Sequence, residues 1–271
     1  MAYTFGGAVG SRCSVTSLIS LGATATAGVV TGWYYPTTLT ATRRYWGAGT
    51  IFGARVAATT SEIELLTDNA TTDGLWTTSG AGIATGNWYF LAVIWANNNT
   101  GPATSWRVYL GTPDTAPALV SLTTTTSPVG NFTGSATYVQ GNTSASNVSF
   151  QGEITDTCLI ATSTFNATTS PLGIAASTTI TAAEEANILN RYILPLWAGD
   201  PARAANHLPQ APNTFDFMYW PATLTANVQR RGSGITALTW IAPTLTSAVY
   251  SAGGSPRPQR SVMVSHPFVP H

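Results

Sequence analysis

Lysine is absent from the 271 residues, and charged side chains make up only 8% of the chain, against about 25% in ordinary globular proteins. The arginines are scattered, with only Arg43-Arg44 and Arg230-Arg231 adjacent. Because phosphate binding needs clustered cations, this composition argues against nucleic acid as a partner. The formal net charge is zero, and a weakly charged surface favours association between proteins. We therefore expect a chain that works inside an assembly.

Cysteine is almost as scarce, with Cys13 and Cys158 alone. Two cysteines are too few to staple a fold of this length or to hold a metal cluster. They could pair if their strands are neighbours, although two reduced and buried thiols are the favoured interpretation. His207, His266 and His271 have no Cys or Glu at metal-ligand spacing.

Long apolar runs are also missing. Met1 to Gly10 has no basic segment followed by an apolar one, so we expect no secretory signal. The stretch from Leu18 to Val30 is broken by Gly, Thr and Ser, which excludes a membrane-spanning helix there. We expect a soluble chain with no membrane insertion.

The most informative stretch that is present runs from Gly86 to Gly111. Trp88 to Trp95 is apolar on both faces of a strand, which predicts a position in the middle of a sheet. Trp106 to Leu110 places Trp106, Val108 and Leu110 on one face and Arg107 and Tyr109 on the other. The polar loop between the two runs makes this a long β-hairpin whose loop, Arg107 and Tyr109 are open to recognition.

The remaining pattern is that of an all-β sandwich with a single helix. Thr181 and Glu184 form a capping-box pattern at the start of a helix expected to extend to Ile193. From Pro195 onward the chain is rich in Pro and Ala and is expected to be extended. The other strands are expected at residues 3–7, 13–19, 27–35, 51–56, 63–66, 74–77, 136–141 and 150–161.

The order of these motifs resembles the laminin-G-like, concanavalin A-like jelly-roll family. The resemblance covers about Tyr3 to Leu196, in the segments GWYYP, GNWYFLAVIW, WRVYLG, FQGEITDTCLI and TAAEEANIL. The matching residues are Trp33, Trp88, Tyr109, Gly111, Gly152, Ile154, Asp156, Thr181 and Glu184. It implies two antiparallel sheets, one of them concave, over residues 1–197.

Residues 198–271 are expected to form a Pro/Ala/Gly-rich extension with short strands and a docking tail. The segments MYWPATL and SHPFVP resemble extensions on such proteins from bacteriophages and prophages. In that case the tail would dock on a neighbouring protein through its apolar residues. These are Val262, Val264, Phe268 and Val269.

Sugar binding would need exposed aromatic rings beside hydrogen-bonding amides. The candidates are Trp46, Trp76, Trp95, Asn97, Asn98 and Tyr109. The alternative is that the aromatic residues fill the core, as most do in a sandwich.

Calcium, which laminin-G-like domains often hold, would bind at Asp68, Asn69 and Asp73. These residue types are commoner as turn formers than as ligands, so the favoured prediction is no cofactor.

Catalysis by paired carboxylates is disfavoured. Glucanases of this fold use two acids on one face, whereas the spacing of Glu153 and Asp156 places them on opposite faces of a strand. Glu62 and Glu64 share a face but are better explained as a solvated strand surface.

We therefore predict a non-enzymatic virion structural protein of a bacteriophage, assembled in the host cytoplasm. It would be a capsid decoration or tail-associated module that binds other virion proteins or copies of itself. The alternative is a glycan-binding adhesin or receptor-binding module. A glucanase-like hydrolase is the least favoured hypothesis.

Overall fold

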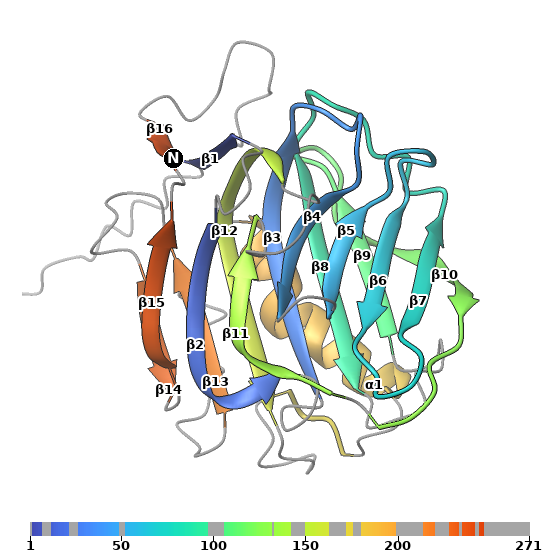
Figure 1. The fold of residues 1–271 in the computed structure, drawn as a ribbon, viewed down its shortest axis with the longest axis vertical. Coiled ribbons are helices and arrows are strands. Elements are labelled where there is room, and N and C mark those ends of the chain that lie inside the picture. The colour runs from blue at the N-terminus through green and yellow to red at the C-terminus, as the bar shows by residue number, and fades with distance from the viewer. Residues whose placement is uncertain are drawn as a thin grey trace, which may run out of the picture.

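The computed structural model describes residues 2–6, 12–21, 27–48, 52–96, 106–131, 133–141, 150–162, 172–175, 180–198, 214–219, 228–232, 235–241 and 244–246. Within these residues the strands form two antiparallel sheets packed face to face, and a helical segment covers the outer side of one of them (Figure 1). The predicted all-β sandwich of jelly-roll type, with one short helical region, is confirmed.

Sheet A carries the helix on its outer face. The central strands β3 and β8 are the ones predicted to be buried on both faces. In spatial order the strands of sheet A are β14 (Val228–Gly232), β13 (Thr214–Tyr219), β12 (Gln151–Thr162), β3 (Ala27–Pro36), β8 (Tyr89–Ala96), β9 (Trp106–Gly111) and the start of β10 (Ala118–Thr126). Strand β1 (Ala2–Gly6) pairs with β12 and with β16 (Thr244–Thr246).

Sheet B packs on the face of sheet A that is opposite the helix. The two sheets are joined by β10, whose first residues pair with β9 and whose later residues pair with β7. After β10 the order is β7 (Gly74–Ser79), β6 (Ile63–Thr67), β5 (Gly53–Val56), β4 (Arg43–Ala48), β11 (Ser135–Gln140), β2 (Arg12–Leu21) and β15 (Ile235–Ile241).

Strand β8 has apolar side chains on both faces because it lies between two cores. Leu91, Val93 and Trp95 point into the core between the sheets. Phe90 and Ile94 point into a second core between sheet A and the helix. The strict alternation of a strand sends successive side chains to opposite faces, so each half of the apolar run fills a different core. This prediction from the sequence is confirmed.

The helical segment consists of α1 (Ala182–Ile188), a π-helical turn η2 (Leu189–Ile193) and α2 (Leu194–Ala198). The capping box is present, since Thr181 accepts from Glu184 N and the Glu184 carboxylate accepts from the Thr181 backbone. The expected end at Ile193 is wrong, because the helix continues through Pro195. Pro195 is the second residue after the π-helical turn, and prolines and π-bulges are both places where a continuous helix departs from regular geometry.

Strands that follow residue 198 add to both sheets. The chain pairs β13 with β12 in sheet A and β15 with β2 in sheet B. The division of the chain at residue 197 stays a prediction. Among the described residues, no helix is both long and apolar enough to cross a bilayer.

The two cysteines lie in different sheets. Cys158, on β12, is buried on the helix side of sheet A, whereas Cys13 belongs to β2 in sheet B. Their strands are therefore not neighbours, and the condition that would have allowed them to pair is not met.

Candidate functional site

Three of the tryptophans expected at a sugar site lie in the core. Trp46, Trp76 and Trp95 each have 0% of their surface exposed. Their indoles, together with that of Trp106, form a continuous stack between the two sheets. The ring centroids are 6.0 Å apart for Trp46 and Trp95, 6.1 Å for Trp95 and Trp106, and 5.8 Å for Trp106 and Trp76. The expectation that these rings are exposed is wrong.

The direction of Trp46 depends on an irregularity in β4. Arg44 lies opposite Arg55, but Trp46 lies opposite Ala54, so the register shifts around Tyr45. A β-bulge of this kind breaks the alternation of faces. Both Tyr45 and Trp46 consequently point into the core between the sheets.

Tyr109 and Arg107 lie on the outer face of sheet A, as predicted, but they are not open to a ligand. The Arg107 Nε donates to Glu185 Oε2 at 3.0 Å, and the Tyr109 hydroxyl donates to Glu185 Oε1. Tyr109 is only 6% exposed beneath the helix. Burial, followed by the hydrogen bond to Glu185, raises the pKa of the Tyr109 phenol. Asn97 and Asn98 lie outside the described residues.

The expected calcium residues lie in one loop and are used to close it. Asp73 Oδ1 accepts from Asn69 N at 3.0 Å, and Asp68 Oδ1 accepts from the Thr133 hydroxyl. Asn69 Nδ2 donates to Gly130 O at 3.2 Å, while Asn69 Oδ1 is buried without a partner among the described residues. Calcium takes six to eight oxygens, and no cluster of three or more acidic, His or Cys side chains occurs in the described part of the chain. The donor set does not fit calcium well.

The acid pair of Glu62, just before β6, and Glu64, within it, is also engaged. Glu64 pairs with Arg55 at 2.5 Å on the outer face of sheet B. Glu62 accepts from Thr78 Oγ1 at 2.6 Å and from the backbone of Gly80 and Ala81. Burial raises the pKa of Glu62, but these hydrogen bonds outweigh it, so the pKa lies below its ordinary value. Both carboxylates are therefore held by structural partners and are not simply solvated.

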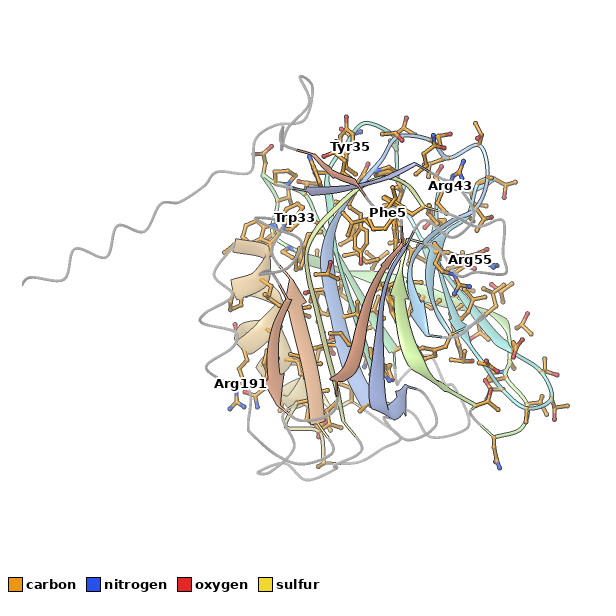
Figure 2. The ribbon with its side chains drawn as sticks, turned by 60° about the vertical axis from the view of Figure 1, so that its left-hand side comes forward. Phe5, Trp33, Tyr35, Arg43, Arg55 and Arg191 are labelled. Carbon is orange, nitrogen blue, oxygen red and sulfur yellow. The ribbon has the colours of Figure 1, made fainter. Side chains whose placement is uncertain are left out.

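A different set of aromatic residues lies at one end of sheet A, on its helix side. Tyr35 and Trp88 pack against each other with ring centroids 5.3 Å apart and an interplanar angle of 41°. Trp197 of α2 is half-buried and donates its Nε1 hydrogen to Thr112 O at 2.9 Å. Thr112 follows β9, whose end lies beside the start of β8 because Phe90 pairs with Gly111. Figure 2 shows Tyr35 at the end of the sandwich, beyond Trp33.

Glu153 lies beside these rings. It is directly opposite Tyr35 in the pairing of β12 with β3, so both side chains project from the same face. Gly152 permits this approach, because a Cβ at its φ of +143° would overlap Tyr35 O. Glu153 is half-buried, and none of the described residues donates a hydrogen bond to its carboxylate. Burial raises the pKa of this carboxyl.

We call Tyr35, Trp88, Glu153 and Trp197 the Tyr35 rim. Sequence reasoning placed Trp88 in the core, which is confirmed because its side chain is buried in the core between sheet A and the helix. It treated Glu153 only as a disfavoured catalytic acid. The alternation in GWYYP shows that Tyr35 and Trp33 share a face, but the sequence alone does not show that the helix leaves Tyr35 half-exposed. The expected docking residues Val262, Val264, Phe268 and Val269 lie outside the described residues.

No family model and no curated protein matches the sequence. Similar solved structures include a native heptameric SAP-like pentraxin of Limulus polyphemus, at 16% identity and TM-score 0.39 over 58% of this chain and 74% of that one. A protein of Bacteroides ovatus described as carbohydrate-binding is 12% identical, with TM-score 0.45 over 89% of this chain and 60% of that one. Mouse laminin alpha1 chain, domains LG4-5, is 15% identical, with TM-score 0.37 over 58% and 40%.

At these identities and TM-scores the comparisons carry no argument about ligands. None of them bears on a phage origin, a virion location or partner proteins, which stay predictions.

Proposed function

We propose that this chain is a carbohydrate-binding module that contacts sugars at the Tyr35 rim and has no catalytic activity of its own. The observation that supports the proposal is the half-buried ring of Tyr35 beside the Glu153 carboxylate on the same face of sheet A, where that carboxylate accepts no hydrogen bond from the described residues. Sugar rings present C–H groups that pack on aromatic faces and hydroxyls that need acceptors. Tyr35 supplies the first kind of contact and Glu153 supplies the second.

The absence of catalysis is proposed because glycoside hydrolysis needs two acids that flank the bond. Glu62 and Glu64 are held by structural partners. The Tyr35 rim contributes a single carboxylate, which can orient a sugar but cannot act as both acid and nucleophile.

The experiment is a glycan array with the full chain, followed by calorimetric titration of the strongest glycan. We expect binding that Tyr35→Ala reduces at least about tenfold, since a stacking aromatic contributes substantially to a small site. The matched control is Tyr89→Ala. Tyr89 is also half-buried and lies next to Trp88 in sequence, but it packs on the core between the sheets. A flat array, or equal losses in the two variants, would refute the proposal.

A further inference from the structure

The loop between β7 and β8 lies beside Tyr35. Gly86 N donates to Pro36 O at 2.9 Å, and a Cβ built on Gly86 would be 3.9 Å from the Tyr35 hydroxyl oxygen. Trp88, which follows the loop, packs its buried ring against the ring of Tyr35. We call residues 80–87 the 80–87 loop. It borders the half-buried phenol at the end of sheet A.

The 80–87 loop offers a ligand only uncharged groups, since it contains no Asp, Glu, Lys, Arg or His. Thr85 and Asn87 are exposed, and Asn87 Nδ2 donates to Thr85 O at 3.2 Å. A carboxamide has two donor hydrogens and one acceptor oxygen. The described residues take only one of these hydrogens. The second hydrogen and Oδ1 of Asn87 are the kind of donor and acceptor that recognise hydroxyl groups.

The other end of the loop is held by Glu62. Its carboxylate accepts from Gly80 N at 2.9 Å and from Ala81 N at 3.0 Å. The backbone just before it contributes as well, because Ile83 N donates to Ser61 O at 2.8 Å. A loop that is already fixed before a ligand arrives loses less conformational freedom on binding, and its affinity is higher for that reason.

We infer that the 80–87 loop forms one side of the sugar site, where Asn87 hydrogen-bonds the hydroxyls of an uncharged sugar that packs on Tyr35 and Glu62 positions the loop. This inference rests on the proposed function and names its ligand class and two further residues. Asn87 contacts the ligand, whereas Glu62 acts only through the loop. Recognition of this kind involves no ion pair, so it should not depend on salt.

The ligand class is tested on the unaltered full chain. The array carries neutral oligosaccharides of glucose, galactose and mannose, each beside its sulfated counterpart. We expect the neutral members to bind at least as tightly as the sulfated ones. For the tightest neutral member, the dissociation constants at about 0.05 M and about 0.5 M salt should agree within about twofold. A preference for sulfated members, or a tenfold loss of affinity at high salt, would overturn the inference.

Asn87→Ala tests the contact with the sugar. It should weaken binding of the same oligosaccharide by about threefold to tenfold, the range for loss of one or two neutral hydrogen bonds. The matched control is Asn187→Ala, at an exposed position of α1. Figure 2 shows Arg191, on the next turn of the helical segment, at the opposite end of the sandwich from Tyr35. Unchanged affinity in Asn87→Ala would overturn the contact.

Glu62→Ala tests the positioning of the loop. It should lower the melting temperature and also weaken binding by about fivefold, because the loop is no longer fixed in advance. Glu62→Gln keeps an oxygen that accepts from the loop amides and should recover part of the affinity. The control Glu64→Gln breaks the ion pair with Arg55 and should leave the affinity unchanged. A lower melting temperature with unaltered affinity in both Glu62 variants would overturn the positioning role.

The outcomes separate this inference from the proposed function. Tyr35-dependent binding that neither Asn87→Ala nor Glu62→Ala weakens would leave the carbohydrate-binding module standing and remove the role of the loop. A flat array would remove both. Tyr89→Ala takes away one hydrogen bond to the loop, from Ala84 N, and should weaken binding far less than Tyr35→Ala does.

Discussion

Tyr109 of β9 donates its hydroxyl hydrogen to the carboxylate of Glu185 in α1, and this contact ties the central hairpin to the helix. Arg107, two residues earlier on the same face, donates to the other oxygen of that carboxylate. The side chains that appear free for recognition in the sequence are therefore the attachment points of the helix. Glu184 caps the helix from within, whereas Glu185 anchors it to the sheet.

This anchor predicts a measurable loss of stability. Glu185→Gln should lower the free energy of unfolding by about 1–2 kcal/mol, because hydrogen bonds to a charged group contribute about 1.5–3 kcal/mol and this one is partly exposed. A double-mutant cycle with Tyr109→Phe, followed by urea unfolding, should give a coupling energy above about 0.5 kcal/mol.

The Arg55–Glu64 pair on the outer face of sheet B is the matched comparison. Glu64→Gln removes a surface pair, for which less than about 1 kcal/mol is expected. Additive effects of Glu185→Gln and Tyr109→Phe would contradict the anchoring role of Glu185.

The capping box makes stability depend on pH. Burial tends to raise the pKa of Glu184, but hydrogen bonds from Ala175 N and from the Thr181 backbone and hydroxyl outweigh it, so the folded pKa lies below the ordinary 4.5. The ionised Glu184 carboxylate therefore stabilises the folded state fully above its ordinary pKa of 4.5. This stabilisation is lost as the pH falls through the lower pKa of the folded state.

Glu184→Ala should lower the free energy of unfolding by about 1 kcal/mol at pH 7. The difference in unfolding free energy between this variant and the unaltered chain should become smaller below about pH 4. Urea unfolding at a series of pH values measures it. Asp114→Asn, in an exposed loop, serves as the control and should show no comparable change. A difference that stays constant down to about pH 2 would argue against the carboxylate as the origin.

The tryptophan stack predicts that stability and sugar binding can be separated. Trp95→Ala should cost about 3–5 kcal/mol, since it removes a fully buried ring between two others, and the near-ultraviolet circular dichroism of the coupled indoles should fall. Tyr35→Ala, at a half-exposed position, should lower the free energy of unfolding by only about 1 kcal/mol while reducing glycan binding at least about tenfold. Loss of binding in a folded Trp95 variant with Tyr35 intact would contradict this separation.

Gly28 provides an independent test of the stack. A Cβ at this position would overlap the indole of Trp95 and lie 2.8 Å from Ile160 O. Gly28→Ala should therefore destabilise the chain by about 1–3 kcal/mol, and the cost should be smaller when Trp95 is replaced by Phe. An equal cost in both backgrounds would show that the backbone contact with Ile160, and not the indole, sets the requirement for glycine.

The features that the sequence predicts correctly are those fixed by local periodicity. The run from Trp88 to Trp95 is apolar on both faces, and a strand buried on both faces is the only strand that fits it. The Thr181–Glu184 pair lies at the spacing of a capping box, which needs no distant partner. In both cases the information lies within about ten residues of chain.

The features that the sequence does not predict depend on distant pairing. Trp46 is directed inward by a register shift between β4 and β5, and no residue type marks that bulge. Glu185 follows Glu184, and helix capping alone explains an acidic residue at this position. Its contacts with Arg107 and Tyr109 join it to a strand more than seventy residues earlier. No pattern in the sequence around Glu185 predicts them. The exposure of Tyr35 is set by where the helix lies on sheet A.

The loop that holds Asp68, Asn69 and Asp73 gives the last prediction. Its two carboxylates already accept hydrogen bonds from Thr133 and from the Asn69 backbone. Millimolar calcium or a chelator should therefore leave the melting temperature unchanged, and Asp73→Ala should destabilise the chain equally in both conditions, by about 1 kcal/mol. Differential scanning calorimetry measures both. Stabilisation by calcium that disappears in Asn69→Ala would show instead that the buried Asn69 Oδ1, which has no partner among the described residues, is a metal ligand.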